Sequence, residues 1–485
     1  MFAAVAGKPY SAWLDTVTPA DADHRYSLLA AEPSCVFRAK GRTIRISTAA
    51  GTDQFPGDPF AVLEELLQQR RGVVVGDPPF PVGAAIGYFG YDLKNWIEDL
   101  PATVADDLGL PDCWFGFYDN LVIFDHGAHH VWQISTAAAH PHPHPLPLPP
   151  NAGWFRSEPS WLQSEPAGAG REKRAGAMCL TEDPRGGGLR SNFTRAAYCA
   201  AVRRAQDYIA AGDIYQVNLS QRFQCDIAAP ARDLYGALRR ANPAPYGAWL
   251  DLGEAQVLSS SPECFLRIHD RDVLTRPIKG TRPRGATPEA DCLRAAELRA
   301  SPKDNAELLM ITDLERNDLG KVCEFGSVHV PDLVRVESYA TVHHLVATVA
   351  GRLRPDVSHV QCVRACFPGG SITGAPKIRA MEIIDELEPH ARGVYTGAIG
   401  FFGYNGISEF NIAIRTAVYV EQPSRLSVVG ARTSGTHVPP SYGRLTFHVG
   451  GGIIADSEPD AEYEETLAKA GGILNAIEQL RLRQR

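Results

Sequence analysis

The length, composition and charge of the chain limit the classes to which it can belong. Its 485 residues exceed what one ordinary hydrophobic core supports, so one large or two medium-sized domains are expected. A hydrophobic content of 44% with 21% charged residues is typical of a soluble globular protein, and a net charge of −8 argues against nucleic-acid binding. No apolar run could span a membrane and no signal-peptide pattern begins the chain, so a cytoplasmic protein without a membrane partner is expected.

The first part of the chain, residues 1–133, is predicted to be rich in strands. Residues 25–48 alternate between polar and apolar side chains and are interrupted by Pro and Gly. Residues 134–190 are rich in Pro, His and Gly, which predicts a linker or an insertion. The ten cysteines include no Cys-x-x-Cys pair, which favours reduced thiols over a zinc site.

The remaining part, residues 191–485, mixes predicted helices and strands without regular βαβ alternation. This pattern favours a mixed, mainly antiparallel α+β architecture. Helical spacing and capping residues predict helices at 191–213, 287–320 (one or two helices), 375–387 and 462–483, and alternation predicts strands at 214–225, 393–404 and 408–420.

Two pairs of acidic residues form the first candidate site. Asp304 and Glu307 are three residues apart in one predicted helix, and Glu462 and Glu465 are three apart in another. This spacing places each pair on one helix face, and together the pairs could surround a hard cation such as Mg²⁺. The alternative for each pair alone is a solvated helix face.

Glycine-rich segments at 366–377 and 448–453 are candidate anion sites. The first resembles a phosphate loop, but Ala375 stands where that loop requires Lys. Exposed backbone amides in such segments bind carboxylates as readily as phosphates. The alternative is that both are ordinary tight turns.

The third candidate combines Glu263, in the segment SPECF, with Lys279, in the basic segment RPIKGTRPRG. A lysine becomes a nucleophile when burial or a nearby cation lowers the pKa of its amine, and a protonated glutamate can act as a general acid. The alternative is a structural ion pair between them. Tyr395, Arg415 and Lys469 are further candidates, although each taken singly is more typical of a surface position.

The ordered motifs together resemble one family. The segments SPECF, PIKGTRPRG, AELLMITDLERNDLG, CFPGGSITGAPK, VYTGAIG, FNIAIRT and HVGGGIIADSEPDAEYEET match the chorismate-utilising enzymes in order over residues 192–485, and RYSLLAAEPS and GYFGYDL extend the match into the N-terminal third. The resemblance implies an α+β fold with large, mainly antiparallel sheets packed as a sandwich and helices on the outside.

Two positions discriminate between branches of this family. Gln216 stands where the water-using branches have a lysine, and Lys279 stands where the anthranilate-forming branch typically has alanine. The resemblance therefore implies amination of chorismate to 4-amino-4-deoxychorismate, with Lys279 as nucleophile and Glu263 as general acid. The chain has no Gly-x-Cys-x-Gly glutaminase motif, so a separate glutamine amidotransferase subunit is expected to provide ammonia. An anthranilate-forming enzyme and a non-catalytic carboxylate-binding subunit remain as alternatives.

The resemblance also implies roles for the other candidates. Mg²⁺ would bind Glu307 and Glu465, supported by Asp304 and Glu462. Substrate would contact Gly280, Thr281, Gly450, Gly452 and Lys469 through its ring carboxylate, Tyr395 and Arg415 through its enolpyruvyl carboxylate, and His344 and Ser371 in the pocket wall. A possible tryptophan pocket would comprise Thr16, Tyr26, Ser27, Pro245 and Tyr246, with Thr16 where the family usually has serine.

Overall fold

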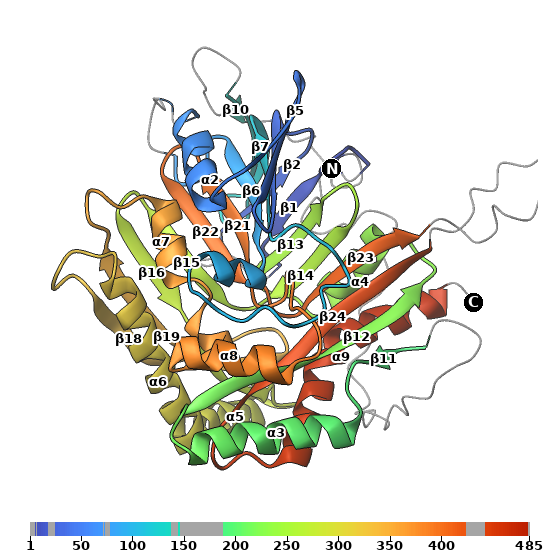
Figure 1. Cartoon of the computed structure of the whole chain (residues 1–485), viewed down its shortest axis with the longest axis vertical. Helices are drawn as coiled ribbons and strands as arrows, with labels where there is room; N and C mark the ends of the chain where they lie inside the picture. The colour runs from blue at the N-terminus through green and yellow to red at the C-terminus, as the bar shows by residue number, and fades with distance from the viewer. Residues whose placement is uncertain are drawn as a thin grey trace, which may run out of the picture.

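Two large β-sheets dominate the computed structural model (Figure 1). The structure describes residues 5, 7–17, 25–70, 72, 78–136, 144–145, 188–422 and 442–483. The predicted connection at 134–190 therefore lies mostly outside the described residues. Each sheet has twelve strands, and every strand pairing in the described residues is antiparallel.

The first sheet joins strands from both ends of the chain. Its spatial order is β10 (His144–Pro145), β9 (His130–Ser135), β8 (Asn120–Asp125), β2 (Tyr26–Ala30), β1 (Ala12–Asp15), β13 (Tyr246–Asp251), β14 (Gln256–Ser261), β23 (Thr416–Gln422), β24 (Tyr442–Ile453), β12 (Gln216–Ile227) and β11 (Arg190–Ser191), with β20 (Gly374–Ala375) also paired to β12. The N-terminal strands thus continue the sheet through the pairing of β1 with β13.

The second sheet is built in the same way. Its order is β17 (Ile278–Pro283), β19 (Val342–Arg352), β16 (Asp272–Arg276), β15 (Cys264–His269), β22 (Ile407–Ile412), β21 (Ala398–Gly403), β6 (Ala84–Phe89), β7 (Cys113–Tyr118), β3 (Cys35–Lys40), β4 (Thr43–Thr48) and β5 (Gly51–Pro56), with β18 (His329–Ser338) also paired to β19. Here β6 joins the N-terminal strands to β21.

The sheets pack face to face around one apolar layer. Leu28 and Val257 from the first sheet share a buried cluster with Ile86 and Ile399 from the second. Burial of these side chains drives the two sheets together, because each apolar face needs a partner. The structure confirms the predicted α+β sandwich.

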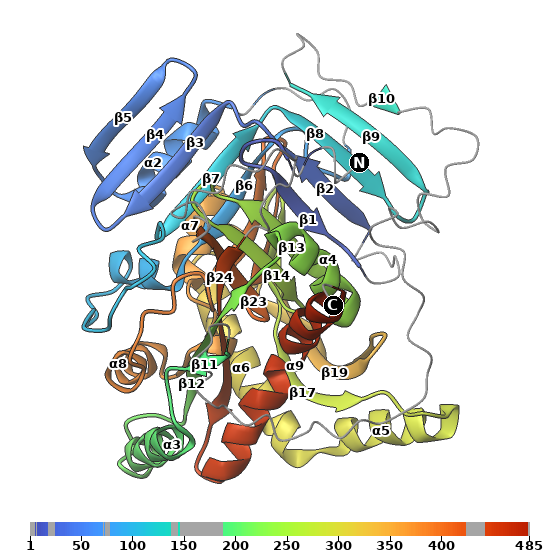
Figure 2. The same cartoon turned by 90° about the vertical axis from the view of Figure 1, so that its right-hand side faces the viewer.

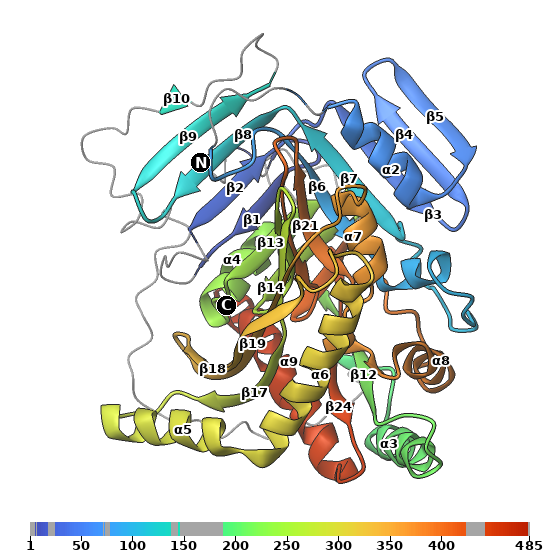
Figure 3. The same cartoon turned by 90° about the vertical axis from the view of Figure 1, so that its left-hand side faces the viewer.

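Helices cover the outer faces, as predicted. They are α2 (Pro59–Gln68), α3 (Arg195–Ala210), α4 (Ala231–Ala241), α5 (Pro288–Ala300), α6 (Pro302–Gly320), α7 (His359–Cys366), α8 (Lys377–Leu387) and α9 (Pro459–Arg483), with short 3₁₀ turns η1 (Tyr91–Trp96) and η2 (Gly370–Ile372). Helices α4 and α9 share a core cluster over the first sheet (Figure 2). Helices α2, α6 and α7 share another over the second sheet (Figure 3). Within the described residues, no helix combines the length and hydropathy needed to cross a membrane.

Two predicted segments divide where the chain changes direction. The segment 287–320 forms two helices, because Ser301 caps the start of α6 with its side chain and Pro302 begins the new helix. The predicted strand 408–420 is split between the sheets into β22 and β23, and Arg415, between them, has a φ of +49°. This crossover is one of two that build the site.

Candidate active site

Glu263 and Arg415 lie at two neighbouring crossovers, where the chain passes from one sheet to the other. Glu263 follows β14 and precedes β15, and Arg415 lies between β22 and β23. The crossovers are joined by backbone hydrogen bonds, from Ile412 N to Glu263 O at 3.0 Å and from Ser260 N to Arg415 O at 3.1 Å. The fold therefore fixes an acid and a cation at one point between the sheets, although 152 positions separate them in the sequence.

Lys279 extends from β17 toward the same point. Its Nζ lies 3.4 Å from the carbonyl oxygen of Ser371, in η2, and the hydroxyl of Ser371 lies close enough to the carboxyl of Glu263 to lower its pKa. Lys279 and Glu263 are close enough for each to shift the other's pKa. The structure thus brings together the two residues predicted to be catalytic.

Burial shifts the two pKa values in opposite directions. It raises the pKa of Glu263, which is 4% exposed, against the opposing effects of the Ser371 hydroxyl and of Lys279. It lowers the pKa of the Lys279 amine, against the carboxylates of Glu307 and Glu263. Both shifts favour the uncharged forms, which are a protonated acid and a free amine. A general acid beside a nucleophile requires these forms.

Gly280 allows β17 to pass close to the start of α6. Its φ is +71°, and a Cβ there would lie 2.8 Å from both Asp304 Cγ and Leu298 Cδ1. The register of β17 against β19 also shifts between Lys279 and Thr281. Only glycine fits both the backbone conformation and the space, so this position holds the candidate nucleophile beside the acidic helix.

The four predicted metal ligands lie near the starts of α6 and α9, and three of them pair with other groups. Asp304 accepts from Arg282 at 3.0 Å, and Glu462 accepts from Ser457 at 2.7 Å. Glu465 pairs with Lys469 at 2.8 Å. Both Glu462 and Glu465 approach Gly451, within 3.4 Å of where its Cβ would lie, and Glu307 faces Lys279. Among the described residues no three potential ligands are gathered closely enough to hold a metal ion.

The charges around these carboxylates nevertheless favour a bound cation. Burial raises the pKa of Glu462, and the neighbouring Glu465 raises it further. Burial opposes ionisation of Glu465 as well, but Lys469 lowers its pKa below the ordinary value. The acidic oxygens are therefore stabilised by a positive charge, and the donor set consists of the hard ligands that Mg²⁺ prefers.

The residues predicted to bind the carboxylates of the substrate each contact a neighbouring group. Tyr395, 6% exposed, stacks on His448 with ring centroids 5.1 Å apart. Arg415 donates to Asn242 Oδ1 at 3.2 Å, and Lys469 Nζ donates to the carbonyl of Gly450 at 2.8 Å. Thus neighbouring side chains fix the phenol of Tyr395 and the guanidinium of Arg415, and Lys469 lies beside the glycine-rich end of β24.

His344 lies next to Thr281 across the β17–β19 pairing. Its Nδ1 is 3.0 Å from Thr281 Oγ1, and its Nε2 is buried without a hydrogen-bond partner among the described residues. Burial lowers the pKa of His344 to about 3, so the ring is neutral near pH 7. A neutral ring with one unused nitrogen can serve a polar ligand as donor or acceptor.

Two polar residues of β12 were not among the predicted binding residues. Both amide atoms of Gln216 and the Oδ1 of Asn218 are buried without partners among the described residues. The Gln216 amide lies against Gly452, whose Cβ would be 2.7 Å from Gln216 Nε2. Leaving such groups unsatisfied is costly, which indicates a polar ligand at this wall. The alternation of polar residues along 216–222 was the available sequence signal.

The predicted tryptophan pocket is internally hydrogen-bonded in part. Thr16 N donates to Ser27 Oγ at 3.0 Å, and Thr16 Oγ1 lies 3.1 Å from Tyr26 O and 3.3 Å from Pro245 O. The fifth residue, Tyr246, directs its hydroxyl to Arg267, 3.4 Å away. Four of the five residues therefore come together, and tryptophan binding remains a prediction.

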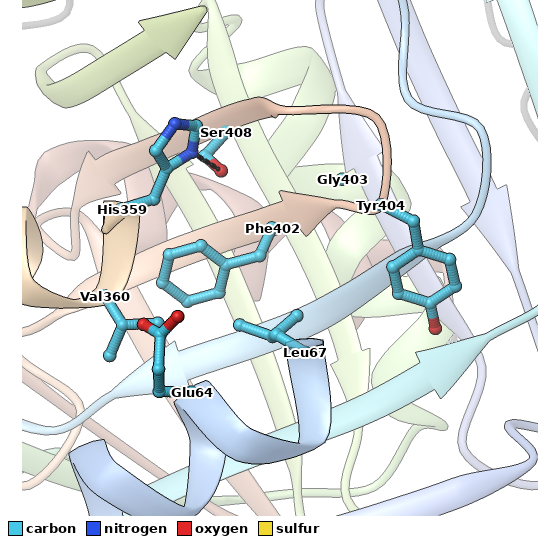
Figure 4. Close-up of a pocket in the computed structure, with 8 residues that line it drawn as sticks. All are labelled: Glu64, Leu67, His359, Val360, Phe402, Gly403, Tyr404 and Ser408. Carbon is cyan, nitrogen blue, oxygen red and sulfur yellow. Dashed lines mark hydrogen bonds between the residues drawn. The ribbon is translucent and has the colours of Figure 1, made fainter. Parts of the chain in front are cut away.

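A small cavity lies elsewhere, between α2, α7 and the β21–β22 hairpin (Figure 4). Its lining consists of Glu64, Leu67, His359, Val360, Phe402, Gly403, Tyr404 and Ser408. His359 Nδ1 contacts Ser408 Oγ at 2.8 Å. None of the predicted site residues lines this cavity, so it is separate from the candidate active site.

Comparisons with known proteins agree with the motifs. A family model described as chorismate binding enzyme matches residues 20–475. Aminodeoxychorismate synthase component 1 of Klebsiella aerogenes is 38% identical over 478 residues, covering 98% of this chain and 96% of that protein. Anthranilate synthase component 1 of Cereibacter sphaeroides is 36% identical over 480 residues, covering 96% and 88%. The two kinds of relative are therefore about equally similar to this chain.

A solved structure extends the agreement to the fold. Anthranilate synthase component I from Streptococcus pneumoniae matches with a TM-score of 0.71 at 27% identity, covering 94% of this chain and 93% of that one. The family model covers the strands of both sheets except β1, and it covers every predicted site residue except Thr16. The chain belongs to the family of chorismate-binding enzymes.

Proposed function

We propose that the chain is component I of an aminodeoxychorismate synthase, which converts chorismate and ammonia to 4-amino-4-deoxychorismate for 4-aminobenzoate and folate biosynthesis in the cytoplasm. The observation that carries this proposal is the position of Lys279. Its amine lies close to the buried carboxyl of Glu263, and burial lowers the pKa of the amine. An alanine at this position, which has no nucleophilic group, could not form a covalent intermediate.

Lys279 and Glu263 divide the substitution into two steps. The Lys279 amine attacks C2 of chorismate, the ring double bonds shift, and the C4 hydroxyl leaves as water with the proton of Glu263. Ammonia then attacks C4, the double bonds shift back, and the bond between C2 and Lys279 breaks. The proton released from ammonia returns to Glu263, so both residues regain their starting forms.

The remaining residues orient the two carboxylates of chorismate. Tyr395 and Arg415 bind the enolpyruvyl carboxylate, since a guanidinium and a phenol provide directed donors. The ring carboxylate lies at the glycine-rich wall and contacts Gly280, Thr281, Gly450, Gly452 and Lys469. His344 and Ser371 complete the pocket, and the Ser371 hydroxyl also lowers the pKa of Glu263.

Mg²⁺, which the family commonly uses, fits the acidic wall. Glu307 and Glu465 would hold it, with Asp304 and Glu462 in support directly or through water. Bound there, it would neutralise the ring carboxylate and fix its position. Mg²⁺ would also replace Lys469 as the main positive charge beside Glu465.

A separate glutamine amidotransferase subunit provides the ammonia. The relatives are named component 1, and the chain lacks a glutaminase nucleophile motif. We expect the purified chain to use ammonium salts alone and to use glutamine only with the second subunit. Glutamine-dependent turnover by the purified chain would contradict this assignment.

Product identity tests the proposal. The purified chain is incubated with chorismate, Mg²⁺ and an ammonium salt, and products are identified by chromatography and mass. Aminodeoxychorismate, with the pyruvyl group retained, is the expected product. Anthranilate would instead assign the anthranilate synthase reaction, which the 36% identity to such an enzyme keeps as the second candidate. Chorismate binding without turnover, even with the second subunit, would indicate a non-catalytic carboxylate-binding subunit.

A further inference from the structure

Arg392 and Glu388 form a buried ion pair behind the candidate active site. Arg392 is 3% exposed and Glu388 is 4% exposed. Arg392 Nε donates to Glu388 Oε2 at 2.9 Å, and Arg392 Nη2 donates to Glu388 Oε1 at 2.6 Å. A buried pair of this kind does not by itself stabilise a fold better than apolar residues would. Its contacts with neighbouring segments therefore indicate its role.

Every N–H of the Arg392 guanidinium has an acceptor. Besides Glu388, Nη1 donates to Ile372 O at 3.1 Å and Thr396 Oγ1 at 3.2 Å, and Nη2 donates to Asn218 O at 2.7 Å. A guanidinium has five such donors in one plane, and all five are used here. One side chain thus links η2, β12 and the segment that precedes β21.

Each linked segment carries part of the site. Ile372 directly follows Ser371, which contacts both Lys279 and Glu263. Asn218 lies on β12 beside the unsatisfied amide of Gln216. Thr396 follows Tyr395, whose ring centroid is 5.7 Å from the guanidinium carbon of Arg392.

Glu388 extends the same connection. Its Oε1 accepts from Ser220 N at 2.7 Å, so the carboxylate also fixes β12 next to Gly450, the register partner of Ser220. Thr396 is held at a φ of +58°, a conformation that a residue other than glycine adopts only when its surroundings impose it. The ion pair of Arg392 and Glu388 therefore holds three segments in one arrangement, namely the strained turn at Thr396, η2 and β12.

We propose that Arg392, oriented by Glu388, is a positioning residue that sets the Ser371 turn and Tyr395 relative to each other, and so aligns Lys279 and Glu263 with the bound substrate. Arg392 has no described contact with the reacting groups and acts through Ile372, Thr396 and the ring of Tyr395. This inference rests on the proposed role of Lys279 and Glu263.

Arg392→Lys is the first test. A lysine keeps the charge opposite Glu388 but has three donors on one nitrogen, so it cannot reach Ile372 O, Thr396 and Asn218 O together. We expect kcat for chorismate consumption to fall by about 10- to 100-fold, as for a misplacement of about 1 Å, with a smaller change in KM. The matched control is Arg239→Lys, in α4, which changes the partner of the buried Asp15 of β1 and should leave kcat unchanged. Wild-type kcat in Arg392→Lys would overturn the proposal.

A double variant separates positioning from stability. Arg392→Met alone leaves Glu388 buried without its partner and should lower Tm strongly. Adding Glu388→Gln removes that charge, so Tm should recover in part. The kcat should stay low, because Ile372 O and Asn218 O still lack their donor. Recovery of kcat together with Tm would show that the pair only stabilises the fold, and would overturn the proposal.

Chemical labelling of Lys279 tests the positioning role of Arg392 without measuring turnover of chorismate. Competitive acylation of the resting enzyme, followed by peptide mapping, measures the reactivity of the Lys279 amine at each pH. In Arg392→Lys we expect altered Lys279 reactivity, since the Ser371 carbonyl beside Nζ has moved, and unaltered reactivity of Lys8. Anthranilate as the wild-type product would refute the proposed function. The kcat and the Lys279 reactivity of Arg392→Lys could still be compared with those of the wild-type enzyme. Unchanged kcat and unchanged Lys279 reactivity would refute the positioning role alone.

Discussion

At Lys279 and Glu263, burial favours uncharged groups and the neighbouring charges favour charged ones. Burial lowers the pKa of Lys279 and raises that of Glu263, and the net shifts follow burial in both cases. The pair therefore has a larger share of its neutral form than the same residues would have in water. This form contains both the nucleophile and the acid of the proposed reaction.

Removal of the amine tests the covalent route. In Lys279→Ala we expect kcat for aminodeoxychorismate formation to fall by at least about 100-fold, because no group remains to attack C2. Mass spectrometry of wild-type enzyme quenched during turnover should show a chorismate-derived adduct on the peptide that contains Lys279. The control is Lys8→Ala, at an exposed ion pair with Glu32. Undiminished turnover in Lys279→Ala would rule out the covalent intermediate.

The pH dependence tests the acid. Wild-type kcat/KM should fall at low pH, where Lys279 is protonated, and at high pH, where Glu263 has lost its proton. Because the two groups interact, the limbs report the pair rather than either residue. Glu263→Gln should lower the rate by about 100-fold or more and should remove the alkaline fall, since no acid then loses a proton. An alkaline limb that persists in Glu263→Gln would assign that titration to another group.

At the scale of elements, the bulge in β17 connects the nucleophile to the acidic helix. Gly280→Ala would place a methyl group 2.8 Å from Asp304 Cγ, at a φ of +71°. We expect a loss of about 1 kcal/mol or more in the free energy of unfolding and a lower kcat, because Lys279 must move with the strand. Thermal unfolding and steady-state kinetics measure both effects.

Gly471 provides the matched control. It lies within α9, and a Cβ there would meet nothing within 4 Å. Gly471→Ala should therefore raise the free energy of unfolding by about 0.5–1 kcal/mol without changing kcat. A Gly280→Ala variant that behaved like Gly471→Ala would show that the bulge tolerates a side chain.

The elements themselves were largely predictable, whereas the contacts between them were not. The helical segments 191–213 and 287–320 were predicted, and the structure begins α3 after the cap Thr194 and α6 after the cap Ser301, both inside those segments. Local patterns carry no information on which strand lies beside which, so the split at Arg415 and the two adjacent crossovers emerge only in three dimensions. The pairing of Glu388 with Arg392 is also invisible in the sequence, because i and i+4 charges most often face solvent.

At the scale of the whole molecule, neither part of the chain completes its own sheets. β1 pairs with β13 in the first sheet, and β6 pairs with β21 over six residues in the second. Tyr88 and Trp114 share the central apolar cluster with Ile399 and Phe401. The crossovers that carry Glu263 and Arg415 lie between these sheets, so the geometry of the site depends on strands that contribute no predicted catalytic residue.

This topology predicts that residues 188–485 do not fold alone. Without the N-terminal strands, β13 and β21 become open edges, and the apolar faces they carry lose their cover. We expect this fragment to unfold without a cooperative transition and to be inactive, and we expect co-expression with residues 1–136 to restore both properties, because the missing strands can pair in trans. Circular dichroism during heating and chorismate turnover are the measurements. A cooperative, active fragment 188–485 would instead establish the predicted boundary near residue 191 as that of an independent domain, and the shared sheets would then be an interface between two folded units.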